Sequence, residues 1–246
     1  MKFSVLTLFP ELVETYVQSS ILGRALEREV FQFEIIQIRD FAINDYGQVD
    51  DSLYGGGVGM LMMCEPVYQA WQRAAGEGKK SRTLVMQAGG RTFDQAMAEE
   101  LAEEDHLILL SGHYEGIDAR VLDEIEAEPV SVGDFVLTGG ELPACLIIDA
   151  TARLLEGVLL KEEAWQEESF SSGLLSERQY TRPEHWRDRQ VPPVLLSGHD
   201  ARIKRHRKHD SLWQTIQMRP DLLDEADLSY EEVYDFLQWL EDEKNK

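Results

Sequence analysis

Two short, nearly continuous apolar runs limit the possible folds of this chain more than any other feature. They are RTLVMQ at 82–87 and HLILLSG at 106–112. Runs of this kind are typical of strands that are buried on both faces of a parallel sheet. Between them, Thr92 can cap a helix over 93–103. The segment therefore predicts a strand, a helix and a second strand of a parallel sheet.

The rest of the first 158 residues continues the same alternation of strand and helix signals. We expect strands at 3–9, 33–40 and 129–132, and helices at 11–29 and 142–155. This alternation predicts an α/β domain with a mostly parallel sheet over residues 1–158.

Residues 159–176 break the pattern, because they are first acidic and then rich in Ser and Gly, with no clear period. We interpret them as a linker that can move. Residues 177–246 predict a small all-α domain. It would contain a basic helix over 200–211 and a last helix capped by Ser229, with Glu232 completing a capping box.

The charge of the chain is unevenly distributed. The formal net charge is −22, which by itself argues against a nucleic-acid partner. Residues 178–208, however, hold nine basic and three acidic side chains, a net of +6, whereas residues 1–176 have a net of −19. A basic segment in an acidic chain fits either a solvated helix face or a surface that binds phosphates.

Other sequence features narrow the class of protein. Two cysteines, Cys64 and Cys145, cannot form a disulfide framework and lack zinc-ligand spacing, so we expect no metal site and a reducing, cytoplasmic environment. The N-terminal residues read as a first strand and not as a secretion signal. No apolar run is long enough for a membrane span, so we expect no membrane association.

Glycine is concentrated in three blocks: YGGGVGM (54–60), GHYEGID (112–118) and VGDFVLTGGELP (132–143) hold nine of the eighteen glycines. The last two blocks each follow a predicted strand and lead into a helix. Ligands bind at such strand ends, where glycine lets the backbone approach a flat molecule such as adenine. One such loop would read as a tight turn, but two on adjacent strands favour a pocket. The motifs of dinucleotide and phosphate loops are absent.

Six blocks then carry a resemblance. YGGGVGMLM, GHYEGIDARV, VGDFVLTGGELPA, SF–GLL, QYTRP and VPPVLLSGH occur in an order and spacing that resemble the bacterial tRNA (guanine-N1)-methyltransferases, of the knotted SPOUT class. The resemblance covers about residues 1–225. It implies a deep trefoil knot in the α/β domain, S-adenosylmethionine as methyl donor, and methylation of guanosine 37, beside the anticodon. It also implies a homodimer whose active site is shared between subunits, and Mg²⁺ as an assisting ion.

The resemblance also implies which residues form the site. The cofactor would be held by Met86, Gln87, Ala88, Gly89, Gly112, Tyr114, Glu115, Val132, Gly133, Asp134, Phe135, Val136, Leu137, Gly139, Gly140 and Pro143. The tRNA would be held by Arg182, Ser197, Gly198, His199, Arg202, Lys204, Arg205, Arg207 and Lys208.

The same resemblance assigns the chemistry to two residues. The family's general base is an Asp immediately before the Ser-Phe pair, and here that position is Glu168. The family's Arg on the last helix of the first domain corresponds to Arg153. Taken alone, Glu168 would read as a solvated linker acid and Arg153 as a surface ion-pair partner. The carboxylate is kept but lengthened by one methylene, so we expect an active enzyme with a lower rate.

Three alternatives remain open from the sequence. One is another knotted RNA methyltransferase that acts on a ribose 2′-hydroxyl. The second is an RNA-binding protein that has lost the catalytic base. The third is a small-molecule α/β enzyme, which the basic segment disfavours.

Overall fold

The computed structural model describes residues 1–76, 80–159, 168–170, 173–224 and 226–244. The chain divides into two compact units, Met1–Lys161 and Glu162–Lys246. Most of the sequence interpreted as a linker, residues 160–167 and 171–172, lies outside the described residues.

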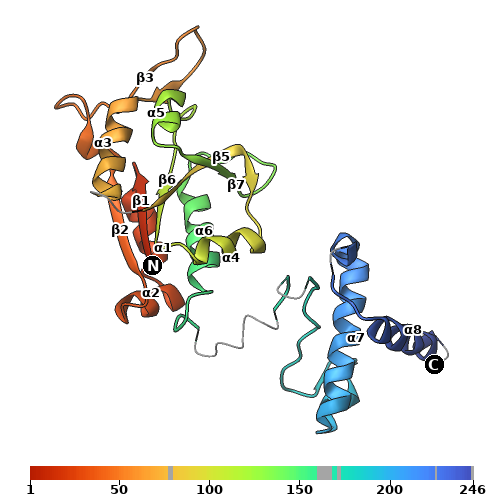
Figure 1. Cartoon of the computed structure of the whole chain (residues 1–246). Helices are drawn as coiled ribbons and strands as arrows, with labels where there is room; N and C mark the ends of the chain where they lie inside the picture. Colours follow the sequence, from red (N-terminus) through yellow and green to blue (C-terminus); the bar gives the residue numbers. More distant parts are fainter. Residues whose placement is uncertain (77–79, 160–167, 171–172, 225, 245–246) are drawn as a thin grey trace. The chain divides into compact units, whose positions relative to one another are not determined.

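A parallel sheet of five strands organises the first unit (Figure 1). The strands are β1 (Lys2–Thr7), β2 (Gln32–Gln37), β5 (Arg82–Thr92), β6 (His106–Leu110) and β7 (Glu128–Ser131), in the order β2-β1-β6-β5-β7. Every neighbouring pair is parallel. The predicted α/β class with a mostly parallel sheet is therefore confirmed.

Helices cover both faces of this sheet. The helices are α1 (Pro10–Val17), α2 (Ser20–Glu27), α3 (Cys64–Ala75), α4 (Gln95–Ala102), α5 (Ala119–Glu124) and α6 (Glu141–Ala152). One buried cluster joins Phe3 and Leu107 of the sheet to α1, α2, α4 and α6. A second joins Leu6 and Ile108 to α3 and α5. Strand residues alternate between these clusters because successive side chains point to opposite faces.

Three elements lie outside these layers or differ from their predicted form. A short 3-10 helix, η1 (Ile38–Phe41), follows β2, and a hairpin of β3 (Asp50–Ser52) and β4 (Met60–Met62) precedes α3. The single helix expected over 11–29 is instead two helices, α1 and α2, because the backbone turns where α2 begins, with a left-handed φ of 53° at Ser20.

The cap of α4 also differs from the prediction. The Asp94 side chain, and not that of Thr92, accepts a hydrogen bond from the backbone N–H of Met97 at 2.8 Å. Thr92 instead remains in β5 and pairs with Ser131. An Asp two residues later can cap the same helix, so the sequence placed the helix but not its first residue.

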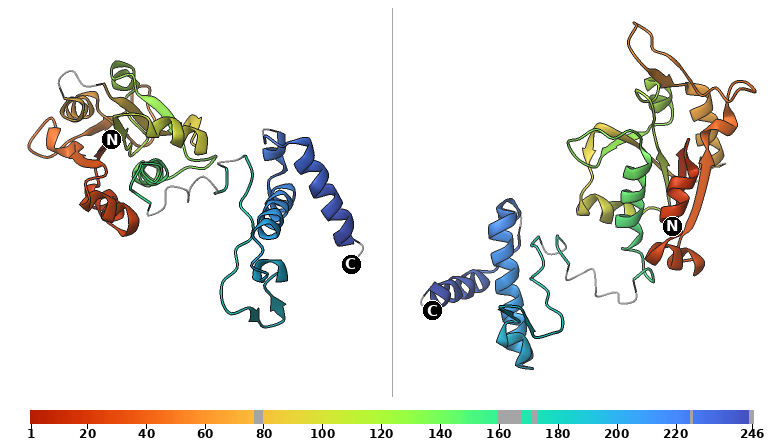
Figure 2. Two further views of the ribbon diagram at one scale, coloured as in Figure 1. Left: turned by 60° about the horizontal axis from the view of Figure 1, so that its bottom comes forward. Right: turned by 180° about the vertical axis from the view of Figure 1, so that it is seen from behind.

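The second unit is mainly helical, as predicted (Figure 2). It contains η3 (Pro193–Leu196), α7 (Asp200–Met218), η4 (Pro220–Asp224) and α8 (Tyr230–Lys244), with Leu174, Leu212 and Phe236 buried at its centre. It also contains a hairpin that was not predicted, formed by β8 (His185–Trp186) and β9 (Arg189–Gln190).

The capping box of α8 is confirmed. The Ser229 hydroxyl accepts a hydrogen bond from the Glu232 N–H at 3.2 Å, and the Glu232 carboxylate accepts one from the Ser229 N–H at 2.9 Å. The basic helix α7 runs beyond the predicted 211 to Met218. Among the helices that the structure describes, none is long and apolar enough to cross a membrane.

Candidate functional site

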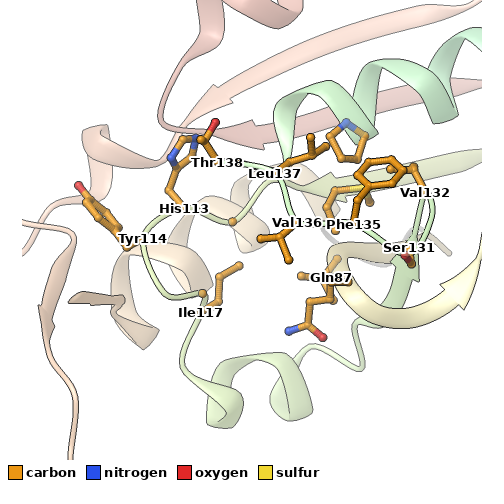
Figure 3. Close-up of a pocket in the computed structure, with 18 of the residues that line it drawn as sticks. Gln87, His113, Tyr114, Ile117, Ser131, Val132, Phe135, Val136, Leu137 and Thr138 are labelled. Carbon is orange, nitrogen blue, oxygen red and sulfur yellow. The ribbon is translucent and has the colours of Figure 1, made fainter. Parts of the chain in front are cut away.

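A cavity of about 230 Å³ opens where β5, β6 and β7 end (Figure 3). Three segments line it: 85–88 from β5, 112–117 after β6, and 131–143 from the end of β7 into α6. The carboxyl ends of parallel strands are the usual position for a ligand in an open α/β sheet. The two glycine blocks that follow β6 and β7 therefore meet at one cavity.

The first wall of the cavity is a local departure from the sheet. Met86 and Arg91 both pair with Val130 of β7, so residues 87–90 leave the ladder between two paired positions of the same strand. Gln87 and Ala88 of this excursion line the cavity. The pairing of β5 with β7 resumes at Arg91, so both ends of residues 87–90 are held by β7.

The second wall is a close crossing of two backbone segments. The N–H of Gly140 donates a hydrogen bond to the carbonyl of Gly112 at 2.9 Å. A Cβ on Gly140 would lie 2.7 Å from the Cα of Ser111, and a Cβ on Gly139 would lie 2.3 Å from Nε2 of His113. Gly140 is therefore required by the backbone crossing itself, whereas Gly139 leaves room for the side chains of His113 and Glu141.

A buried polar chain holds this crossing in place. The Thr7 hydroxyl donates to Oε1 of Glu141 at 2.6 Å, and Oε2 of Glu141 lies 2.8 Å from Nε2 of His113. Glu141 is almost completely buried in the first turn of α6, where a carboxylate also interacts favourably with the helix dipole. Its two hydrogen bonds are what make the burial of a carboxylate tolerable.

Sequence reasoning missed this chain of residues. His113 and Glu141 both lie inside the glycine blocks, but no role was predicted for either side chain. A carboxylate in the first turn of a helix, directly after two glycines, is the signal that could have identified Glu141. Thr7 carries no such local signal, because it reaches Glu141 only through the pairing of the sheet.

Most residues expected to hold the cofactor line the cavity. They are Met86, Gln87, Ala88, Gly112, Tyr114, Glu115, Val132, Gly133, Phe135, Val136, Leu137, Gly139, Gly140 and Pro143. Gly89 and Asp134 are not among the lining residues. Val85, His113, Gly116, Ile117, Ser131 and Thr138 line it in addition.

The outer rim of the cavity is apolar and exposed. Tyr114, in a left-handed conformation with φ 60°, and Phe135 and Val136 after β7 each keep a large exposed surface. Large apolar side chains gathered at the mouth of a cavity mark a place where a ligand or another protein surface covers them. Together with the glycine crossing, this gives a cleft suited to a flat, partly apolar molecule.

The two residues expected to do the chemistry lie in different units. Arg153 caps the C-terminus of α6, where its N–H donates to the carbonyl of Asp149 at 3.2 Å, and its side chain is half-buried. Glu168 is half-buried at the start of the described part of the second unit. Neither residue is among those that line the cavity.

The cations of α7 are largely neutralised by neighbouring carboxylates. Arg205 pairs with Asp235 of α8, Lys208 lies 3.0 Å from Glu232, and Arg207 lies 3.5 Å from Glu177. Within the described part of the chain, Arg202 and Lys204 form no ion pair. Residues 178–208 therefore have a positive net charge, but only some of their cations remain free to contact a partner.

His209 also contributes to the packing of α7 against α8. Its Nε2 lies 2.8 Å from Oδ2 of Asp235, and its ring lies 5.3 Å from that of Trp239. Burial lowers the pKa of His209, although the hydrogen bond with Asp235 opposes this. Among the described residues no three metal-ligating side chains cluster, so His209 has a packing role in the structure.

Comparison with known proteins identifies the family. The family model described as tRNA (Guanine-1)-methyltransferase TrmD matches residues 1–225. A tRNA (guanine-N(1)-)-methyltransferase of Ruminiclostridium cellulolyticum is 49% identical over 224 residues, which cover 90% of this chain and 96% of the relative. Those of Bacillus licheniformis and Brevibacillus brevis are 44% and 45% identical, with 100% and 99% of this chain and 100% of each relative covered. The predicted resemblance is confirmed, and the chain belongs to the TrmD family of tRNA (guanine-N1)-methyltransferases.

Proposed function

We propose that this tRNA (guanine-N1)-methyltransferase modifies guanosine 37, beside the anticodon, with S-adenosylmethionine bound in the cavity at the ends of β5, β6 and β7. The observation that carries the proposal is the glycine crossing at Gly112 and Gly140, which leaves a cleft for a flat ligand beside bare backbone. Bound there, S-adenosylmethionine supplies an activated methyl group on a sulfonium.

The residues of the cavity fit this cofactor. Ile117, Val136 and Leu137 offer an apolar surface to an adenine ring, and the glycines beside them let the ring approach the backbone closely. The carboxylate of Glu115 lines the same cavity and complements a cation such as a sulfonium or an ammonium group.

The chemistry requires a base, because guanine N1 carries a proton and is a poor nucleophile until that proton is lost. We assign Glu168 as the base that accepts it and Arg153 as the cation that stabilises the negative charge developing on guanine O6. The N1–methyl bond forms as the bond from sulfur to that methyl breaks, and the proton stays on the Glu168 carboxylate.

The apolar surface of the first unit supports a homodimer. Six large side chains, each between 38% and 55% exposed, lie on or beside α1, α2 and α6: Phe9, Leu12, Tyr16, Ile21, Leu142 and Leu146. A second copy of this surface would cover them. Phe135 to Leu137 continue this apolar character to the rim of the cavity, so a dimer would share the active site between its subunits.

The remaining parts of the proposal follow from family membership and from the described contacts. We propose the trefoil knot of the SPOUT class, which the backbone crossing of 111–113 and 139–141 supports. Cys64 and Cys145 are both free thiols, which fits the cytoplasm as the place of the reaction. The tRNA would use the residues expected from the sequence, with Mg²⁺ as an assisting ion.

A direct assay tests the proposal. The full chain is incubated with labelled S-adenosylmethionine and unmodified tRNA, and the nucleosides are analysed for 1-methylguanosine, with and without Mg²⁺. We expect the label in 1-methylguanosine and none in a tRNA whose guanosine 37 is replaced by adenosine. Label in a 2′-O-methylated nucleoside, or undiminished label in the replaced tRNA, would overturn it.

The base has its own test. Glu168→Gln should lower kcat by about 100-fold or more, since that is the usual contribution of a positioned general base. The affinity for S-adenosylmethionine should not change, and Glu168→Asp should keep turnover because it keeps the carboxylate. Full turnover by Glu168→Gln would mean that another group removes the proton.

A further inference from the structure

The second unit contains the short hairpin of β8 and β9 (Figure 2). His185 pairs with Gln190 and Trp186 with Arg189, so Arg187 and Asp188 form a two-residue loop. Every residue from 181 to 190 is exposed. Arg187 has a φ of 54°, a left-handed conformation that is uncommon for a residue with a long side chain. Tight hairpin loops require such a positive φ, and glycine or asparagine usually provides it.

The conformation of the loop places a cation over an aromatic ring. The guanidinium carbon of Arg187 lies 4.7 Å from the centre of the Trp186 ring, which is the geometry of a cation–π interaction. Even so, Trp186 remains 57% exposed. The indole is thus held by Arg187 and still leaves more than half of its surface open for stacking.

The arginines around this indole are also without anionic partners. Within the described residues, Arg182, Arg187 and Arg189 form no ion pair. This contrasts with α7, where Arg205, Arg207 and Lys208 each pair with a carboxylate. The hairpin lies in the basic segment 178–208 of this acidic chain. Its arginines are cations that no carboxylate of the described residues neutralises.

We propose that the β8–β9 hairpin is a binding site for a single-stranded nucleotide of the tRNA, whose base stacks on Trp186 while Arg187 and Arg189 contact the neighbouring phosphates. An exposed aromatic side chain beside cations is how proteins bind unpaired nucleotides without reading their sequence. The arginines favour a polyanion over an apolar protein surface. The inference rests on the proposed function only in that tRNA is the substrate.

The stacking is tested by binding measurements on the full-length protein with unmodified tRNA and no cofactor. Trp186→Ala should weaken tRNA binding by about ten-fold or more, as is usual when one base loses its aromatic partner, and Trp186→Phe should recover most of that loss. Tyr230→Ala is the matched control, since Tyr230 is an exposed aromatic side chain of the same unit at 84% exposure. It should leave the Kd unchanged.

The charge contacts have a separate readout. The slope of log Kd against log salt should fall by about 0.7–0.9 in Arg187→Ala and again in Arg189→Ala, because each lost phosphate contact releases fewer counterions. An excess of single-stranded RNA should compete for the Trp186-dependent part of the affinity better than an excess of duplex RNA. In the methyl-transfer assay the lost affinity should appear as a higher KM for tRNA in the Trp186, Arg187 and Arg189 variants, whereas Tyr230→Ala should keep the KM and kcat of the unmodified chain.

Failure of the inference differs from failure of the proposed function. If Trp186→Ala binds tRNA as tightly as the unmodified chain, the hairpin is not a nucleotide site, even where guanosine 37 is methylated. If no methyl transfer occurs but the Trp186 and arginine variants still weaken tRNA binding, the nucleotide site at the hairpin is supported and the assigned reaction is wrong. Equal loss in Trp186→Ala and Trp186→Phe would also overturn the stacking.

Discussion

At the scale of single residues, the cavity depends on positions where a Cβ has no room. The sequence showed that glycines gather after two strands, and that pattern correctly predicted two loops at one sheet edge. It could not show that the backbone N–H of Gly140 donates a hydrogen bond to the carbonyl of Gly112, 28 positions earlier in the chain. Such a contact is set by how the strands are ordered, which local patterns do not contain. The same applies to Thr7 and Glu141.

Gly140→Ala should abolish cofactor binding while the second unit keeps its fold. The new Cβ would lie 2.7 Å from the Cα of Ser111 and 2.9 Å from the backbone nitrogen of Gly112, so one segment must withdraw and break the crossing. Isothermal titration with S-adenosylmethionine measures this. Unchanged affinity in Gly140→Ala would show that the crossing is not needed for the cofactor.

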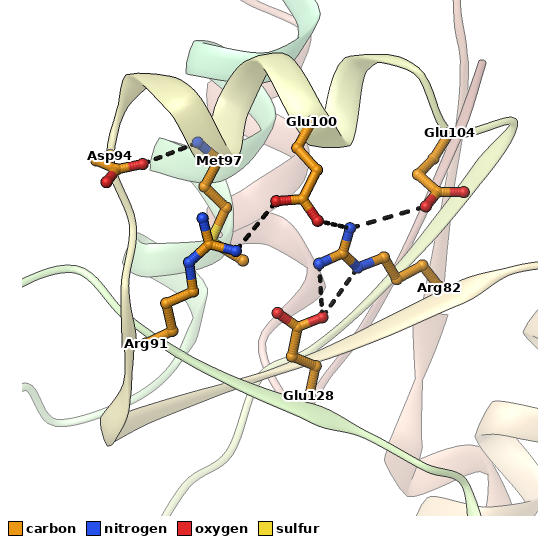
Figure 4. A network of polar contacts seen from close by, with 7 residues as sticks. All are labelled: Arg82, Arg91, Asp94, Met97, Glu100, Glu104 and Glu128. Carbon is orange, nitrogen blue, oxygen red and sulfur yellow. Dashed lines mark hydrogen bonds and ion pairs between the residues drawn. The ribbon is translucent and has the colours of Figure 1, made fainter.

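At the scale of elements, a network of ion pairs spans the excursion of β5 (Figure 4). One oxygen of Glu100 in α4 lies 2.6 Å from Arg82, before the excursion, and the other lies 3.0 Å from Arg91, after it. Arg82 also lies 2.7 Å from Glu128 of β7. The two arginines hold the pKa of the Glu100 carboxyl below its usual range. The network therefore fixes both ends of the loop that supplies Gln87 and Ala88 to the cavity.

Glu100→Gln should raise the Kd for S-adenosylmethionine several-fold, with little effect on kcat at saturating cofactor. Without the Glu100 charge between Arg82 and Arg91, residues 87–90 become less ordered in the free protein. Binding of S-adenosylmethionine must then order them, which lowers its affinity. Titration at low and high salt measures the effect, which should shrink at high salt because exposed pairs are screened. Glu99→Gln, one residue away on the same helix and hydrogen-bonded only to Gln95 among the described side chains, should behave like the unmodified chain. Equal effects of the two substitutions would remove the specific role of Glu100.

The helices α7 and α8 give a prediction about pH. Hydrogen bonds from the backbone and side chain of Ser229, and from Lys208, lower the pKa of Glu232 to about 2, from an ordinary value of 4.5. A lowered carboxyl pKa stabilises the fold fully above the unfolded value, and the contribution is lost as the pH falls from about 4.5 toward 2. The Glu232 side chain is 39% exposed, so screening by solvent limits the contribution to about 0.5–1 kcal/mol.

Glu232→Gln should therefore destabilise the second unit at pH 7, and the gap from the unmodified chain should narrow as the pH falls below 4.5. Urea unfolding followed by tryptophan fluorescence measures it in a Trp71→Phe background, where the remaining tryptophans lie in the second unit. A gap that stays constant from pH 7 to pH 3 would show that the carboxylate charge of Glu232 does not stabilise α8.

The elements also show what the sequence could predict. The apolar runs located β5 and β6, and the capping box located the start of α8. The excursion at 87–90 was not predictable, because Gln-Ala-Gly-Gly reads as the end of a strand and only the pairing with Val130 shows that the strand resumes. The β8–β9 hairpin was missed for a similar reason. Its loop contains Arg-Asp, and not the glycine or asparagine that usually signals a tight turn.

At the scale of the whole molecule, family membership is carried by residues 1–225, whereas α8 begins at Tyr230. The acidic helix that pairs with α7 therefore lies beyond the residues that the family model matches, although the relatives of Bacillus licheniformis and Brevibacillus brevis align with it. The proposed dimer concerns the other unit and its exposed apolar surface on α1 and α6.

Leu146→Glu should convert the proposed dimer to a monomer and remove methyl transfer, since a charge on α6 would be buried against the partner without compensation. Sedimentation velocity measures the mass, and the 1-methylguanosine assay measures the activity. Leu237→Glu is the matched control, because Leu237 is similarly exposed but lies on α8 of the second unit. An unmodified chain that sediments as a monomer, or an active monomeric Leu146→Glu, would contradict the shared site.

The pairing of α7 with carboxylates of its own chain has a thermodynamic consequence. When a phosphate replaces Asp235 at Arg205 or Glu232 at Lys208, it displaces a tethered anion that cannot diffuse away. The cations released from that phosphate are partly offset by the cations that the freed carboxylate attracts, so the exchange gains less of the entropy that normally drives proteins onto nucleic acids. The ionic-strength dependence of tRNA binding should therefore correspond to fewer charges than the nine basic residues of 178–208. The salt dependence that remains would come mainly from cations that form no ion pair among the described residues, such as Arg187 and Arg189 of the β8–β9 hairpin.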